Sequence, residues 1–180
     1  MKKSLTILVL LLLCLKGYSQ PYYRTDMGAI TITGIFNGAS THAESKHLNL
    51  QVNYDNATFN MQLPVSSIVS NNDSLNIILK ETIDQIGFTG RMNMKMDVIS
   101  VPTKNHPKQI FPIEGVLVLN KKGNPIQFTA ILEHINGSKT SCMLSGRFTI
   151  DLNDFGWNFN SNERVITIQF VDIILGKYSE

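Results

Sequence analysis

Cysteine is scarce in this sequence, which has only Cys14 and Cys142 among its 180 residues. Cys14 lies in an apolar N-terminal run, and removal of that run would leave Cys142 alone. A chain with a single cysteine cannot form an internal disulfide. Because Cys142 alternates with apolar residues, we expect its thiol to be buried and chemically inert.

Motifs for catalysis are missing as well. No serine stands in a Gly-x-Ser-x-Gly elbow, no histidine is close to Cys142 in the strand that holds it, and no phosphate-binding loop or dinucleotide fingerprint occurs. The pattern His42-x-Glu44-x-x-His47 resembles a metal cluster only superficially, because it lacks the adjacent His-Glu pair of the zinc-protease helix. The sequence therefore predicts a protein that is not an enzyme and that uses no cofactor and no metal.

Long hydrophobic runs are limited to the N-terminus, where residues 1–19 have the features of a signal peptide. Lys2 and Lys3 precede the apolar run Leu5–Leu15, and small residues stand at the −3 and −1 positions of a cleavage between Ser19 and Gln20. The run is shorter than the roughly 20 residues that a transmembrane helix needs. We expect no membrane span and a mature chain that is periplasmic or secreted.

A lipoprotein acylated at Cys14 is the alternative for this segment. Leu13 is bulky for the position directly before an acylated cysteine, so this alternative is the weaker one.

Clusters of one charge are also missing. The sequence has 16 Lys and Arg and 14 Asp and Glu, and three of the lysines (Lys2, Lys3 and Lys16) lie in the signal peptide. Cleavage leaves 13 basic residues and a net charge of −1. Without a Lys/Arg cluster to follow phosphates, we expect no nucleic-acid partner. The remaining residues 20–180 are enough for one domain with its own core.

What the sequence does have is alternation of apolar and polar residues. This pattern predicts eight strands, at residues 30–36, 48–54, 58–63, 86–98, 110–119, 125–135, 138–152 and 165–175. Only Asp73–Ile83 has helical spacing, with Asp73 as a candidate N-cap. A series of strands with one wet face closes most economically into an antiparallel barrel, which removes the edges. We predict an all-β fold, an antiparallel β-barrel of about eight strands with one short helix; a two-sheet sandwich is the alternative.

The last two strands form the organising hairpin of this prediction. Cys142, Leu144 and Phe148 fall on one face of the first strand, and Ile168 and Phe170 on one face of the second. Asp172 continues the apolar face of the second strand. Either a bulge turns it outward or it lies at the barrel mouth, and a catalytic role is the least favoured option.

The predicted barrel interior is rich in methionine and phenylalanine. Alternating methionines on residues 88–98 either fill gaps in an irregular core or line a cavity that adapts to a long apolar ligand. Four glycines in inward positions leave room there or let the sheet bend: Gly34, Gly90, Gly115 and Gly146. The predicted cavity lining is Phe59, Met61, Phe88, Met92, Met94, Met96, Phe128, Leu132, Leu144, Phe148, Ile168 and Phe170.

Three stretches of the chain resemble the YceI-like family. Gly146–Trp157 is similar to the strand and Asp-Phe-Gly turn before that family's last strand. Ile113–Leu119, followed by Gly123–Phe128, resembles the family's Gly-x-Leu-x-Leu-x-Gly strand and the next strand, and Asn56–Ser67 resembles the strand before its helix. The family's Arg-Asp-x-His-Leu element is replaced by Asn72–Lys80. The resemblance implies a single YceI-like domain over residues 20–180, with a lipocalin-like barrel around a tunnel for a polyisoprenoid or isoprenoid quinone.

Two functions follow from these observations. The first is an exported, non-enzymatic barrel that binds a long apolar lipid of the isoprenoid type in its interior. The alternative is a structural or interaction protein whose barrel is filled by its own side chains and takes no small-molecule ligand. Either function is compatible with a homodimer.

Overall fold

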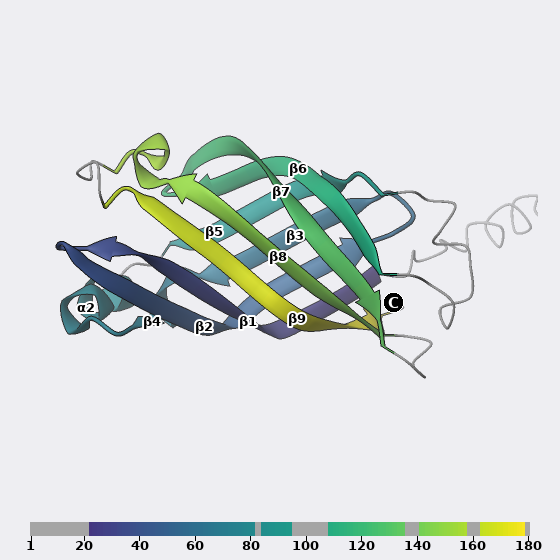
Figure 1. Cartoon of the computed structure of the whole chain (residues 1–180), viewed down its shortest axis with the longest axis horizontal. Coiled ribbons are helices and arrows are strands. Elements are labelled where there is room, and N and C mark those ends of the chain that lie inside the picture. Colours follow the sequence, from purple (N-terminus) through teal and green to yellow (C-terminus); the bar gives the residue numbers. More distant parts are fainter. Residues whose placement is uncertain (1–21, 82–83, 95–107, 136–140, 158–162, 179–180) are drawn as a thin grey trace, which may run out of the picture.

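The computed structural model describes residues 22–81, 84–94, 108–135, 141–157 and 163–178, and most of them lie in strands (Figure 1). The strands are β1 (Tyr22–Phe36), β2 (Ala39–Asn53), β3 (Thr58–Pro64), β4 (Val69–Ser70), β5 (Gln85–Met92), β6 (Gln109–Leu119), β7 (Lys122–His134), β8 (Ser141–Asp151) and β9 (Val165–Tyr178). One α-helix, α2 (Asp73–Glu81), and two 3₁₀ turns, η1 (Val65–Ser67) and η3 (Leu152–Phe155), complete the described elements.

The sheet closes into a barrel. Its strand order is β1-β9-β8-β7-β6-β5-β3-β2, and β1 also pairs with β2, which joins the two ends. All these pairs are antiparallel, and the short β4 also pairs with β2, at Ala43 and Glu44. The predicted eight-stranded antiparallel barrel is therefore confirmed, and the sandwich alternative is wrong. Closure gives every barrel strand a neighbour on both sides, which removes most of the edge that another chain could pair with.

The first two strands are longer than predicted. They meet in a two-residue turn, Asn37–Gly38, whose φ angles of 51° and 74° suit the twist of a tight hairpin. Strand β2 has a bulge at Lys46 and His47, which are both exposed. The bulge changes the inward-facing positions of β2 from odd numbers up to Ser45 to even numbers from Leu48 on. The first half of β2 escaped prediction because small and polar residues, not large apolar ones, face inward there.

Strand β5 is shorter than predicted. We expected a strand to Val98, but the ladder ends at Met92, and residues 95–107 lie outside the described part of the chain. The next residue on β6 is Pro112, which has no N–H to donate to a ladder. Its carbonyl still accepts a hydrogen bond from the Asn93 N–H (2.9 Å). The predicted hairpin turn at Asn136–Gly137 also lies outside the described residues.

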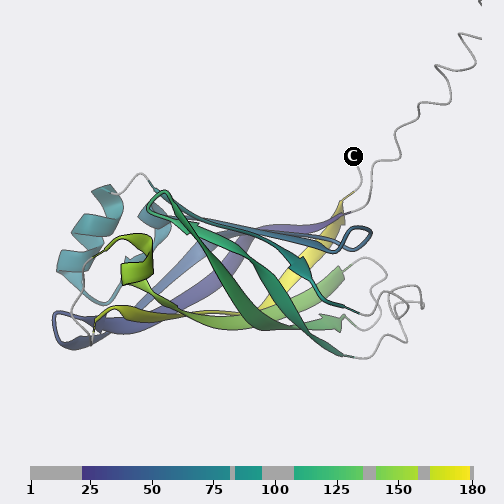
Figure 2. The same cartoon turned by 90° about the horizontal axis from the view of Figure 1, so that it is seen from above.

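The predicted helix is confirmed as α2, but its cap is not Asp73. The Asn72 side chain accepts a hydrogen bond from the backbone N–H of Leu75 (3.0 Å), so Asn72 is the N-cap and Asp73 is the first helical residue. Helix α2 and η3 lie at one end of the barrel, and β9 ends at the other (Figure 2). Among the described residues, no helix has the length and apolarity needed to cross a membrane.

Candidate functional site

The predicted cavity-lining residues lie in the barrel interior, with two exceptions. The ten that are buried, each with 6% or less of its surface exposed, are Phe59, Met61, Phe88, Met92, Phe128, Leu132, Leu144, Phe148, Ile168 and Phe170. Met94 is only partly buried and follows the end of β5, so its prediction as a strand residue is wrong. Met96 lies outside the described residues.

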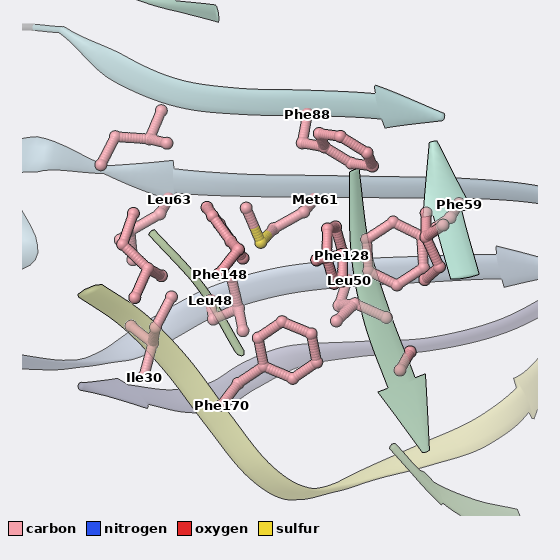
Figure 3. Packing of buried hydrophobic residues seen from close by; sticks show 14 of the residues in the cluster. Ile30, Leu48, Leu50, Phe59, Met61, Leu63, Phe88, Phe128, Phe148 and Phe170 are labelled. Atoms are coloured by element: carbon pink, nitrogen blue, oxygen red, sulfur yellow. The ribbon is translucent and has the colours of Figure 1, made fainter. Parts of the chain in front are cut away.

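Five phenylalanines from five strands meet in the middle of the barrel (Figure 3). The ring of Phe128 is central: its centroid lies 5.9 Å from that of Phe59, 5.5 Å from Phe88, 5.0 Å from Phe148 and 6.3 Å from Phe170. Edge-to-face and offset arrangements at these distances are the favourable ones for aromatic pairs. The barrel thus holds a cross-section packed by its own rings.

The inward glycines do not leave empty space. Gly90 and Gly115 are partners across β5 and β6, and a Cβ on either would lie 2.7 Å from the Phe88 ring. A Cβ on Gly146 would overlap the ring of Phe170, its partner on β9. Aromatic rings therefore cover these three glycines. The prediction that they leave room in the interior is wrong for these positions, and the alternative, that they let the sheet bend, remains.

A small polar group lies toward the barrel end where β1 begins and β9 ends. Tyr54 Oη and Cys142 Sγ are 3.3 Å apart, and the Tyr23 ring packs edge-on against Tyr54 with centroids 4.9 Å apart. Burial raises the pKa of the Cys142 thiol to about 11, and it raises the pKa of Tyr54 as well. Cys142 is buried, as predicted, and it remains a protonated thiol at neutral pH.

The bulge predicted as one option for Asp172 is present. Leu144 pairs with Ile173 and Gly146 with Phe170, so Val171 and Asp172 together face Ser145. Asp172 is exposed, with a φ of 53°; its N–H donates to Ser145 Oγ (2.9 Å), which in turn donates to its carboxylate (3.2 Å). The bulge turns the carboxylate out of the barrel and lets Ile173 point inward.

The histidine pattern does not form a site. His42, Glu44 and His47 are all exposed on β2. Within the described ranges, no three His, Cys, Asp or Glu side chains gather to hold a metal ion. Asp151, at the end of β8, has a structural role: it accepts a hydrogen bond from the Asn153 N–H (3.0 Å) and pairs with Arg164 (3.0 Å).

Sequence reasoning missed a split in the barrel wall between β7 and β8. Ladder pairs join these strands from Thr129–Arg147 to His134–Cys142. No ladder pair joins residues 122–128 of β7 to residues 148–151 of β8, although the structure describes both segments. A concavity of about 290 Å³ lies in the split, lined by Asn124, Pro125, Ile126, Gln127, Thr149, Ile150, Asp151, Asp154 and Phe155. Pro125 was the available signal, because proline inside a strand is typical of a missing neighbour.

Comparisons with known proteins agree with this fold. The structure is similar to that of a polyisoprenoid binding domain from Saccharophagus degradans implicated in plant cell wall breakdown, with a TM-score of 0.68, 10% identity, and coverage of 88% of this chain and 98% of that one. It is also similar to BcnA of Burkholderia cenocepacia, with a TM-score of 0.61, 13% identity, and coverage of 83% and 96%.

A search of curated proteins found no match. The family model described as the YceI-like domain matches residues 20–174, which is most of the chain. Together with the closed eight-stranded barrel, this match shows that the chain belongs to the YceI-like family.

Proposed function

We propose that this protein is an exported barrel that binds a long apolar lipid of the isoprenoid type and catalyses no reaction. The observation that carries the proposal is the chemistry of the interior. Side chains from all eight barrel strands form one apolar cluster, and no charged side chain is buried among the described residues. Such a lining suits a hydrocarbon chain, because pockets for apolar ligands are lined mainly by aliphatic and aromatic groups.

The interior must rearrange to take a ligand, because the phenylalanine cluster occupies its middle. Met61 and Met92 are buried in the same core cluster as these rings, and methionine adapts its shape more readily than branched side chains do. A bound chain would restore the contacts that the displaced rings lose, at about 25 cal/mol for each Å² of apolar surface buried. The family match and the structural similarity to a polyisoprenoid binding domain support this choice of ligand class.

The experiment that tests the proposal is native mass spectrometry of the protein expressed with residues 1–19 and collected from its native compartment. We expect an apolar adduct that is lost on extraction with organic solvent. Titration of the extracted protein with a long-chain isoprenoid alcohol should change the fluorescence of Trp157, the only tryptophan, which packs against the core. A clean apo mass together with unchanged fluorescence would contradict lipid binding.

Export is tested separately by the mass of the mature chain. Cleavage before Gln20 would give a protein that begins at this residue, and it should be recovered outside the cytoplasm. An intact N-terminus on protein from the cytoplasm would contradict export and leave lipid binding untouched.

The packed aromatic cluster favours a second function, that of a structural or interaction protein with a filled barrel. In this case the interior serves stability alone, and the loops bind another exported protein. A reproducible cross-linked partner, together with an empty ligand screen, would favour this function over lipid binding.

A further inference from the structure

The split between β7 and β8 is lined by residues from both faces of the sheet. Gln127 and Thr149 point outward on their strands, and Ile126 and Ile150 point inward, yet all four line the same concavity. No ladder pair joins the two strands here, so backbone hydrogen bonds do not hold this part of the wall together.

The η3 turn follows β8 and lines the split with Asp154 and Phe155. The Asn124 side chain donates to the carbonyl of Asp154 (2.8 Å), and the Asn120 side chain donates to the carbonyl of Phe155 (3.2 Å). Phe155 is buried and lines the concavity. These hydrogen bonds join amide side chains to a single short turn, so they can open without breaking a strand ladder.

The inner side of the split is closed by two rings. Phe128 and Phe148 follow directly after Thr129–Arg147, the last ladder pair, on the side where the strands separate. Their centroids are 5.0 Å apart with the ring planes tilted by 32°, and both rings belong to the central phenylalanine cluster. A chain that passed between the strands would meet the interior at these rings.

A second interruption of the ladders, between β1 and β9, has a different character. Pairing there stops after Arg24–Gly176 and resumes at Thr31–Gln169. The buried Ile173 side chain packs beside Gly28 in this gap and fills it. The two openings therefore differ, because the one between β7 and β8 keeps a concavity.

We propose that the split between β7 and β8 is the entrance through which a long apolar chain reaches the barrel interior, with η3 as its cover and the Phe128–Phe148 pair as its inner closure. This inference rests on the proposed lipid-binding function. It assigns to the lateral wall the passage that an open barrel mouth would otherwise provide.

The test is a cross-link across the split. Gln127→Cys and Thr149→Cys place thiols on its two sides, and a short bismaleimide with a cleavable disulfide joins them. All proteins carry Cys14→Ser, and the buried Cys142 is left in place. The probe is a fluorescent long-chain isoprenoid alcohol. We expect the link to slow uptake about tenfold or more, to slow release from preloaded protein similarly, and to lose both effects when it is cleaved.

The matched control joins the same strands where they are already paired. Thr129 and Arg147 are partners in the ladder and both are exposed, so a Thr129→Cys/Arg147→Cys link should change neither rate. An independent variant, Asn124→Ala, removes one hydrogen bond that holds η3 and should speed uptake severalfold.

The outcomes separate the entrance from the proposed function. If linked and unlinked Gln127→Cys/Thr149→Cys proteins take up the probe equally fast, the entrance is wrong and lipid binding stands. If the control link slows uptake just as much, the effect comes from general stiffening and the entrance is again wrong. If unlinked protein binds no probe at all, the proposed function fails and the entrance fails with it.

Discussion

At the scale of single residues, the barrel wall is built by pairing glycines with aromatic rings. Gly146 on β8 faces Phe170 on β9, and the ring lies over the glycine. Gly90 and Gly115 are covered by Phe88 in the same way. Because the glycine lacks a Cβ, the ring can lie flat against the backbone and fill the interior at close-packed density.

Gly146→Ala should therefore destabilise the protein by about 1–3 kcal/mol, because the new methyl group overlaps the Phe170 ring and forces it to move. The measurement is the free energy of unfolding in urea. Gly87→Ala is the matched control on β5, since a Cβ there meets nothing within 4 Å. Equal effects of the two substitutions would show that the ring does not depend on Gly146.

The thiol of Cys142 should make stability depend on alkaline pH. Burial raises its pKa from the ordinary value of 9.0 to about 11, so the unfolded chain releases this proton before the folded protein does. Between these pH values the unfolded state binds fewer protons, and the free energy of unfolding falls as pH rises. The thiol's contribution is fully present below pH 9 and is lost as pH rises through about 11.

Cys142→Ala should flatten this decline between pH 9 and 11, as measured by urea unfolding at several pH values. Part of the decline should remain at the upper end, because burial also raises the pKa of Tyr54, which stays in the variant. The readout is the slope with pH, so a uniform loss of stability from the smaller side chain does not affect it. An unchanged slope would contradict the pKa assignment.

At the scale of elements, bulges and turns decide which residues face inward. The bulge at Asp172 in β9 reverses the alternation after Phe170 and brings Ile173 and Leu175 to the interior. Without it, the polar Asp172 would point into the core. The bulge of β2 at Lys46–His47 does the same for Leu48. Each bulge lets one strand point side chains into the core both before and after the bulge.

Asp172→Val should destabilise the protein by about 1–3 kcal/mol, because a β-branched residue is strained at the φ of 53° and its side chain cannot accept the hydrogen bond from Ser145 Oγ. Asp172→Gly loses the same hydrogen bond without the backbone strain, so it should cost clearly less. Thermal and urea unfolding of both variants measure the difference. Equal losses for valine and glycine would locate the effect in the hydrogen bond alone.

At the scale of the whole molecule, the barrel has one continuous core from end to end. Phe128 joins its parts, because its ring contacts phenylalanines from four other strands. The same ring closes the inner side of the split between β7 and β8. Stability and access to the interior therefore depend on the same residue.

Phe128→Ala should destabilise the protein by about 3–5 kcal/mol, because it removes the centre of the cluster and leaves a cavity. Val116→Ala is the control, since Val116 is 45% exposed on the outer face of β6 and should change stability little. Urea unfolding gives both values. If the variant lost much less than expected, the cluster would not be the packed centre of the barrel.

Much of the fold was determined by sequence alone. Side chains alternate across a strand with a period of two, so a barrel with one wet face must show its strands as apolar alternation. This is why the hairpins from Leu48 to Leu63 and from Cys142 to Leu175 were found, and why Asp172 stood out as a residue that needed a bulge. Ten of the twelve residues predicted to line the interior are buried there. The Asn37–Gly38 turn was not predicted, although Asn-Gly is typical of a hairpin, because the small residues after it concealed the next strand.

Only the tertiary structure decided what fills the interior and where the wall is open. From sequence, Gly146 is expected to leave empty space in the interior. In the structure the Phe170 ring fills this space, because the register of β8 and β9 places Phe170 opposite Gly146. The split between β7 and β8 depends on how far two strands stay paired, while each strand taken alone has an ordinary pattern. Alternation can be read from one strand alone. Packing and pairing depend on which residues of other strands lie next to it, and this is set by the strand order and register of the closed barrel.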